Sequence, residues 1–238
     1  MTRLTTCPDA EAVAVRAAAH VRRELGRACE QRGVAHLALS GGTTPGRTYE
    51  LLAQAPDALA GTEIWFADER CVAPDDPESN YRLAREALLE PAHIAAAQTH
   101  RMHGELGAQE GASRYAQELA ARLEGAEAVL DVVILGIGPD GHVASLFPGA
   151  DTLDADEHEL CLPVEGAPKP PPERITLSLA VLRAARGCTL LATGASKADA
   201  VSAMLAEPSR HVPASLLRRE RLTVIVDDAA APASAISE

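Results

Sequence analysis

The first 33 residues carry the pattern of an amphipathic helix. Between residues 9 and 32, apolar side chains recur at every fourth position: Val13, Ala17, Val21 and Leu25. This spacing places them on one face of a helix. Asp9 can accept a hydrogen bond from a free N–H group of the first turn, and Gly33 is a typical terminating residue. The sequence therefore predicts a helix over 9–32 with one buried face.

Short apolar runs along the rest of the chain predict strands. They are "AHLALSGG" (35–42), "TEIWFADER" (62–70), "AVLDVVILGIG" (128–138), "LCLPVE" (160–165), "RITLSL" (174–179), "CTLLATG" (188–194) and "LTVIVDD" (222–228). Further helices are predicted at 44–54, with Pro45 in the first turn, and at 79–89, 111–124 and 196–207. Strands that alternate with helices predict an α/β fold, a mostly parallel sheet with helices on both faces. We expect a single domain over 1–238.

The proline-rich segment "EGAPKPPPER" (165–174) interrupts this alternation. Its prolines exclude a helix and favour an extended loop. The sequence leaves two interpretations open. The segment is either a linker or a loop that borders a ligand cleft.

Composition narrows the class of function. The 238 residues are 47% hydrophobic and only 3% aromatic, and the formal net charge is −12. Few aromatics and an acidic balance argue against nucleic-acid binding and against an anionic membrane surface. The five cysteines are scattered, and neither a signal peptide nor a transmembrane run is visible. We expect a cytoplasmic protein with no obligate protein partner, in which local cations or backbone donors hold any anionic ligand.

Ligands of open parallel sheets bind beyond the carboxyl ends of the strands, and the first predicted strand end carries a phosphate-binding pattern. In "LSGGTTPGRTYELL" (39–52), Gly41 and Gly42 permit a sharp turn, and Thr43 or Thr44 can cap the helix that follows. The free N–H groups of that helix then favour a phosphate. The alternative is an ordinary strand–helix turn. No G-K-[ST] follows, so ATP hydrolysis is not indicated.

Charged residues follow the strand that ends at "FADERC" (66–71). Asp68 can accept a proton or a hydroxyl hydrogen bond, and Arg70 offers a planar fork for phosphate oxygens. The alternative is a surface ion pair. Asn80, in "DDPESNYR", can enter the same cleft or serve with Ser79 in capping a helix.

The segment "GIGPDGHVASLFPG" (136–149) imitates a dinucleotide fingerprint through its glycines. A dinucleotide site requires a helix of about a dozen residues after Gly141. Here Pro148 and Gly149 end the segment too early, so this interpretation is rejected. What remains is a turn that presents Asp140 and His142. A histidine there can act as a general base, with Asp140 orienting it. The alternative is a histidine that satisfies loop carbonyls.

Two further features concern a possible anion site and a possible metal site. In "LLATGASKADAV" (190–201), Ser196 can cap a helix, and Lys197 would then lie in its first turn. A cation is unfavourable there unless an anion binds beside it, and the alternative is a tolerated surface lysine. His100 and His103 have a possible metal spacing but no helix pattern and no third ligand nearby, so we predict no metal site.

Together these segments resemble the 6-phosphogluconolactonase family. The similarity rests on "LSGGTTP", "WFADERCVAPDDPESNYR", "GIGPDGHVASLFPG", "PKPPPERITLSL", "TGASKADAV" and "VPAS", in that order over roughly residues 10–230. Glucosamine-6-phosphate isomerase, of the same superfamily, resembles the chain in three of these turns. Its pattern, however, has a glutamate where Phe147 stands and a tyrosine where Arg70 stands. Val143 replaces a threonine that is common in the lactonases.

The resemblance implies a Rossmann-like fold and hydrolysis of 6-phospho-D-glucono-1,5-lactone to 6-phospho-D-gluconate, in the oxidative pentose phosphate pathway. His142 would activate water, and Asp68 would orient hydroxyls or the water. The phosphate would be held by Gly41, Gly42, Thr43, Arg70 and Lys197. Asn80, Gly141 and Arg174 are further possible substrate contacts. No metal or organic cofactor is implied. The competing hypotheses are an amino-sugar-phosphate isomerase/deaminase and a non-catalytic sugar-phosphate sensor.

Overall fold

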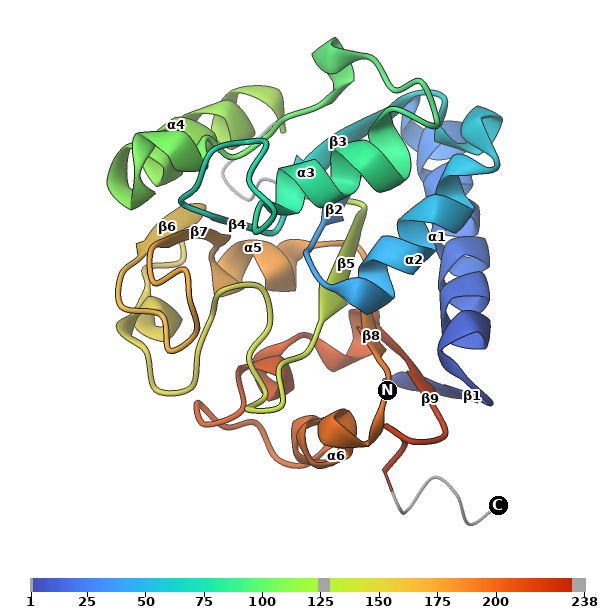
Figure 1. Cartoon of the computed structure of the whole chain (residues 1–238), viewed down its shortest axis with the longest axis vertical. Coiled ribbons are helices and arrows are strands. Elements are labelled where there is room, and N and C mark those ends of the chain that lie inside the picture. Colours follow the sequence, from blue (N-terminus) through green and yellow to red (C-terminus); the bar gives the residue numbers. More distant parts are fainter. Residues whose placement is uncertain (1, 124–128, 233–238) are drawn as a thin grey trace.

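The computed structural model describes residues 2–123 and 129–232, and it places two sheets side by side. The larger sheet has the strand order β1-β9-β8-β5-β2-β3, and all of its strands are parallel (Figure 1). Its strands are β1 (Arg3–Cys7), β2 (Ala35–Leu39), β3 (Thr62–Phe66), β5 (Val132–Gly136), β8 (Cys188–Ala192) and β9 (Leu222–Asp227). The predicted α/β class is confirmed, and β5 and β8 lie in the middle of the sheet.

The second sheet corrects part of the strand prediction. It consists of β4 (Asp68–Arg70), β7 (Arg174–Leu177) and β6 (Cys161–Val164), and its pairings are antiparallel. The run 62–70 was predicted as one strand, but it divides at Ala67. The N–H of Ala67 donates to Leu39 in the large sheet, and its carbonyl accepts from Leu177 in the small one. The chain therefore changes sheets at this residue.

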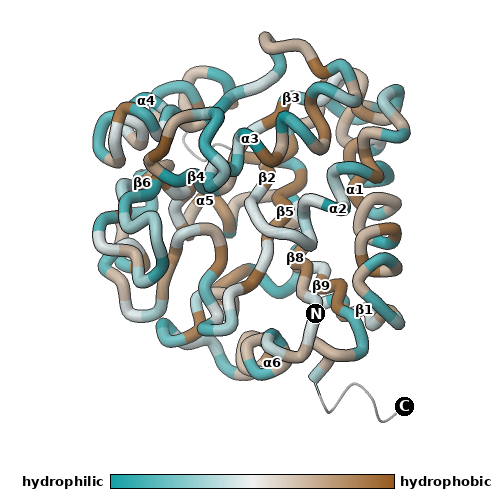
Figure 2. The backbone as a smooth tube through the Cα atoms, viewed as in Figure 1, coloured by the Kyte–Doolittle hydropathy of each residue, from teal (hydrophilic) through white to brown (hydrophobic). Residues whose placement is uncertain are grey.

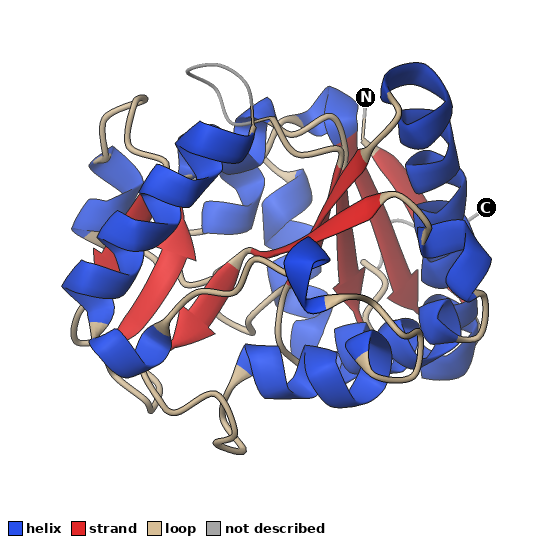
Figure 3. Ribbon diagram, turned by 90° about the horizontal axis from the view of Figure 1, so that it is seen from above, coloured by secondary structure: helices blue, strands red, loops and turns tan. Residues whose placement is uncertain are grey.

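Helices flank the large sheet on both sides (Figure 3). The helices are α1 (Ala10–Arg32), α2 (Thr43–Ala53), α3 (Asn80–Ala84), α4 (Ala108–Arg122), α5 (Leu179–Ala184) and α6 (Ala198–Leu205). The ends of α1 match the prediction, because Asp9 accepts from the Ala12 N–H at 2.8 Å and Gly33 adopts φ 79°. Helix α3 continues as a π-helical segment, Arg85–Leu89. Strand β1 and helix α5 were not predicted, and the predicted ends at Glu124 and Ala128 lie outside the described residues.

A continuous hydrophobic core joins the two sheets. Figure 2 shows the apolar segments gathered on the central strands and the polar ones on the outside. The core includes Leu37 and Ile134 of the large sheet together with Ile175 of the small one, all fully buried. This favours the predicted single domain. None of the described helices has both the length and the apolar composition that crossing a membrane requires.

Candidate active site

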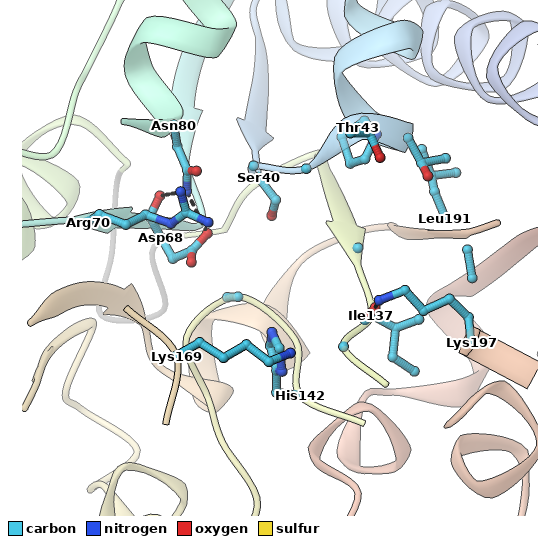
Figure 4. Close-up of a pocket in the computed structure, with 18 of the residues that line it drawn as sticks. Ser40, Thr43, Asp68, Arg70, Asn80, Ile137, His142, Lys169, Leu191 and Lys197 are labelled. Atoms are coloured by element: carbon cyan, nitrogen blue, oxygen red, sulfur yellow. Dashed lines mark hydrogen bonds between the residues drawn. The ribbon is translucent and has the colours of Figure 1, made fainter. Parts of the chain in front are cut away.

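A pocket of about 300 Å³ lies where the parallel strands end. The turns after β2, β3, β5 and β8 form it, together with the proline-rich loop 165–173 (Figure 4). Of the residues predicted as functional, the lining includes Gly41, Gly42, Thr43, Asp68, Arg70, Asn80, His142, Arg174 and Lys197. The proline-rich segment is therefore a loop at the pocket rather than a linker between domains.

The glycine turn after β5 presents His142 to this pocket. The Gly138 N–H donates to the His142 carbonyl and the Gly141 N–H donates to the Gly138 carbonyl, both at 2.9 Å. A Cβ on Gly138 would lie 2.1 Å from the imidazole, so only glycine leaves room for the ring. Residues 139–149 continue as turns, so the helix of a dinucleotide site is not formed.

Gly141 shapes the same turn from outside the pocket. It adopts φ 83°, and a Cβ there would approach Val212 to 2.8 Å. Its carbonyl accepts from the Ala214 N–H at 3.0 Å. Gly141 is not among the residues that line the pocket, and its contacts are packing contacts; its possible contact with substrate stays a prediction.

Asp140 holds the imidazole from one side. Its Oδ1 lies 2.5 Å from His142 Nδ1. Burial lowers the pKa of His142, and the neighbouring Asp140 only partly offsets this. Burial disfavours the charged form of Asp140, but the attraction and hydrogen bond of His142 outweigh it, and the pKa of Asp140 falls. Both directions favour a neutral imidazole beside an ionised carboxylate at neutral pH. With Nδ1–H directed at Asp140, Nε2 is the free basic nitrogen.

Phe147 covers the other side of the histidine. Its ring is buried, and its centroid lies 4.7 Å from that of His142. A carboxylate at this position would give the imidazole a second charged partner, whereas the phenyl ring gives it an apolar wall. The guanidinium carbon of Arg174 lies 5.5 Å above the same phenyl ring. Val143 is fully buried in this segment, where an apolar side chain suits its surroundings.

Asp68 is fixed by hydrogen bonds on both carboxylate oxygens. Asn80 Nδ2 donates to Oδ1 at 3.1 Å and to the Asp68 carbonyl at 2.8 Å, and Ser145 Oγ donates to Oδ2 at 2.7 Å. The Asn80 amide also fits closely against Gly41, where a Cβ would lie 2.0 Å from Asn80 Oδ1. Asn80 therefore positions Asp68, and Gly41 makes room for that amide. Ser145 is fully buried and bonded, which agrees with a structural role.

Asn80 itself is positioned by a buried carboxylate beneath it. Glu69 accepts from the backbone N–H groups of Asn80 and Tyr81 and from the Ser79 hydroxyl. Burial raises the pKa of Glu69, and these hydrogen bonds oppose the rise. Ser79 Oγ also accepts from the Arg82 N–H at 3.2 Å, as its predicted capping role requires.

The first turn of α2 forms one corner of the pocket. Gly42 adopts φ 112° before the helix, which begins at Thr43. The predicted capping by Thr43 or Thr44 is wrong, because Gly42 occupies the cap position and no side chain bonds there. Thr44 Oγ1 instead lies 2.7 Å from Thr193 Oγ1. The N–H groups of this first turn remain available to an anion.

Lys197 stands beside this corner. Its Nζ donates to the Ile137 carbonyl at 2.8 Å, so the side chain crosses from the α6 side toward the glycine turn (Figure 4). Burial lowers the pKa of Lys197, and the Lys169 ammonium lowers it further. The predicted cap at Ser196 is wrong, since a 3-10 turn spans Ala195–Lys197 and α6 begins after it.

The structure places Arg70 apart from two of the other predicted phosphate ligands, Thr43 and Lys197. Figure 4 shows Arg70 with Asp68 and Asn80 on the side of the pocket opposite Thr43 and Lys197. Its guanidinium donates to the Glu78 carbonyl. Its Nε is buried and finds no hydrogen-bond partner among the described residues. The pocket thus has two separate cationic sides.

The sequence prediction missed Lys169, which lines the pocket from the proline-rich loop. Figure 4 shows its side chain extending toward His142. A signal for it exists in the composition. Of the 22 lysines and arginines, only Lys169 and Lys197 are lysines, and both line this pocket.

The two histidines considered for a metal site contact different carboxylates. His100 lies between Glu63 and Glu118, whereas His103 approaches Glu105.

Comparisons with known proteins identify the family of this chain. A sequence model of the family "Glucosamine-6-phosphate isomerases/6-phosphogluconolactonase" matches residues 8–226. A 6-phosphogluconolactonase of Streptomyces coelicolor is 38% identical, over 94% of this chain and 91% of that protein. A 6-phosphogluconolactonase of Homo sapiens is 39% identical, over 74% and 69%.

Solved structures agree with the sequence relatives. The 6-phosphogluconolactonase from Trypanosoma cruzi aligns with a TM-score of 0.87 at 26% identity, over 100% of this chain and 98% of that one. A monomeric glucosamine-6-phosphate deaminase aligns with a TM-score of 0.79 at 21% identity, over 96% and 98%. The second likeness shows a shared fold only, so the side chains of the pocket have to decide between the two activities.

Proposed function

This chain belongs to the glucosamine-6-phosphate isomerase/6-phosphogluconolactonase family, and we propose that it hydrolyses 6-phospho-D-glucono-1,5-lactone to 6-phospho-D-gluconate. It is accordingly a carboxylic ester hydrolase of the oxidative pentose phosphate pathway. The observation that carries the choice within the family is the histidine between Asp140 and Phe147. The imidazole has a carboxylate on Nδ1 and an apolar ring beside it. An isomerase would have an acid at position 147.

The proposed reaction begins with His142. Its Nε2 removes a proton from a water molecule, and the oxygen attacks the lactone carbonyl. Asp140 stabilises the imidazolium that forms. The tetrahedral intermediate then collapses, the bond from the carbonyl carbon to the ring oxygen breaks, and the imidazolium returns its proton to that oxygen. The products are a carboxylate and a free hydroxyl, and the released carboxylic proton balances the hydrolysis.

The substrate is held at two places in this proposal. The phosphate binds at the N–H groups of Gly42 and Thr43 and at the Lys197 ammonium, all from residues that line the pocket. Figure 4 shows Thr43 and Lys197 on the same side of it. On the opposite side, Asp68 accepts hydrogen bonds from sugar hydroxyls, and Arg70 supplies a further cation there. Local donors of this kind are required because the net charge of −12 opposes an anionic substrate. No metal or organic cofactor enters these steps, and we expect the enzyme to act in the cytoplasm.

The test compares His142→Gln with wild type on freshly made lactone, after subtraction of spontaneous hydrolysis. We expect a loss of at least about a hundredfold in kcat, because general-base catalysis typically contributes about 10²–10⁴-fold. The matched control is His158→Gln, since His158 is exposed and away from the pocket. Full activity of His142→Gln would remove the proposed base.

Two substrate comparisons test the remaining parts of the proposal. The same lactone without its phosphate should be hydrolysed much less efficiently, and equal efficiency would remove the phosphate corner. Ammonia release from glucosamine 6-phosphate would favour the isomerase/deaminase instead. Ligand-induced stabilisation without any turnover would favour the sensor.

A further inference from the structure

Arg174 begins strand β7, directly after the proline-rich loop. Its side chain is buried, with 4% of the residue exposed, and it pairs in register with Arg70 of β4. The guanidinium turns back onto the loop. Nε donates to the Pro171 carbonyl at 3.1 Å, and Nη2 donates to the carbonyls of Lys169 at 2.9 Å and Pro170 at 3.3 Å. Nε and Nη2 of Arg174 are therefore bonded to the loop backbone.

The loop depends on such a donor because of its composition. Pro170, Pro171 and Pro172 have no N–H group, so the loop has few backbone donors of its own, and the Lys169 carbonyl cannot close an ordinary turn onto residue 172. One backbone hydrogen bond, from the Ala167 N–H to the Pro172 carbonyl at 2.9 Å, spans the loop from the other side. A single buried guanidinium thus binds the carbonyls of Lys169, Pro170 and Pro171.

Lys169 is the loop's contribution to the pocket. Its ammonium carries the one side-chain charge that the loop places among the lining residues, near both His142 and Lys197. Burial lowers the pKa of His142 most, the carboxylates of Asp140 and Asp68 raise it, and the positive charge of Lys169 lowers it. A displaced Lys169 would therefore leave His142 more readily protonated and less available as a base.

Arg174 also reaches the histidine through Phe147. Its guanidinium lies over the Phe147 ring, whose other neighbour is the imidazole of His142. Phe147 is itself buried, so the apolar wall beside the base does not depend on this contact, and lysine at 174 keeps a cation near the ring. Neither contact requires Arg174 to touch substrate.

We propose that Arg174 is a positioning residue that acts through Lys169: it fastens loop 165–173 so that the Lys169 ammonium stands in the pocket beside His142. This role rests on the proposed function and replaces a direct phosphate contact for Arg174. It makes Lys169 a part of the active site that the chain supplies from a segment without regular structure.

The test is a double-mutant cycle of Arg174→Lys and Lys169→Ala. Lysine keeps the charge at 174 but lacks the planar fork that binds several carbonyls. We expect each single variant to lower kcat/KM about tenfold and to shift the acid limb of its pH profile to higher pH. The double variant should be no worse than Lys169→Ala alone, since Arg174 acts through that residue.

A second readout does not depend on turnover. The His142 imidazole is titrated by NMR, with its signal assigned from the His142→Gln variant. Its midpoint should rise in Arg174→Lys and in Lys169→Ala, and by the same amount in the double variant. If wild type did not hydrolyse the lactone, the proposed function would fall, and the titration would still decide the role of Arg174.

Controls separate positioning from a loss of folding. Arg221→Lys is the matched control, because Arg221 also donates to backbone carbonyls, those of Ala184 and Ala185. It should leave the His142 titration unchanged. If Arg174→Lys does not fold, Pro171→Gly loosens the loop while leaving Arg174 in place, and it should shift the titration in the same direction. Multiplicative losses in the double variant, or an unmoved titration in a folded single variant, would overturn the proposal.

Discussion

Replacing Asp140 by asparagine should produce an enzyme with a lower plateau of activity and a wider acid range. The substitution keeps the shape of the side chain and removes the charge that lies 2.5 Å from His142 Nδ1. A hydrogen bond to a charged group contributes about 1.5–3 kcal/mol. The Asp140 side chain is 34% exposed, so solvent screens the interaction and the lower end of the range applies. About 1.4 kcal/mol corresponds to a tenfold change, so kcat/KM should fall about tenfold.

The direction in which the pH profile moves tests the role of the Asp140 charge. Asp140 raises the pKa of His142 against the larger lowering by burial. Without the carboxylate that pKa falls further, so the base stays neutral to lower pH, and the acid limb of kcat/KM moves to lower pH. The ratio of variant to wild-type activity should therefore improve on acidification.

Acid release in a pH-stat, with fresh lactone at each pH, measures this profile. Asp154→Asn is the control, because Asp154 pairs with Arg210 on the surface at 2.6 Å and should matter little. An acid limb that stayed in place or moved to higher pH, with an unchanged plateau, would refute the assigned role of Asp140.

Two further predictions concern the walls of the pocket. Gly41→Ala places a methyl group 2.0 Å from Asn80 Oδ1, so Asn80 must shift from Asp68. We expect kcat/KM to fall about tenfold and the melting temperature to drop as well, because a buried, hydrogen-bonded side chain is displaced. Full activity would contradict the packing argument. Since Lys169 and Lys197 are the only lysines, acetylation should modify few sites besides them. Mass spectrometry should show that 6-phosphogluconate slows the acetylation of both lysines. Equal acetylation rates with and without 6-phosphogluconate would show that neither lysine lies at the bound ligand.

Local signals predicted the helices better than the strands. Asp9 and Gly33 mark the ends of α1 through contacts within a few residues, so the prediction reached the correct bounds. The runs at 160–165 and 174–179 are apolar enough for strands, but nothing local states their partners. They join β4 rather than the large sheet, because Ala67 bonds to both sheets and redirects the chain. Such a change of sheet depends on contacts between Leu39, Ala67 and Leu177, which lie far apart in the sequence.

The active-site prediction shows the same division. His142 and Asp140 lie within one turn, so their pairing could be read from the chain. Lys169 lies 27 positions after His142 and reaches it only because the loop folds back over the pocket. Arg70 was grouped with Lys197 through the family resemblance and its suitability for phosphate, and the sheet change at Ala67 carries it to the other side of the pocket (Figure 4). For Arg70, the sequence predicted that an arginine would reach the pocket but not on which side of it the arginine would lie.

Phe147 links the choice of reaction to the geometry of the loop. Its ring lies close to both His142 and Arg174, with the imidazole centroid at 4.7 Å and the guanidinium carbon at 5.5 Å from its centre. A carboxylate there would give His142 a second anionic partner and raise its pKa. It would also attract the Arg174 guanidinium away from the carbonyls that hold Lys169. A single acidic side chain at position 147 would thus have two effects. It would make His142 more readily protonated, and it would weaken the contacts that hold the Lys169 loop. For this reason the apolar residue at 147 belongs with hydrolysis, in which a neutral histidine has to accept a proton from water.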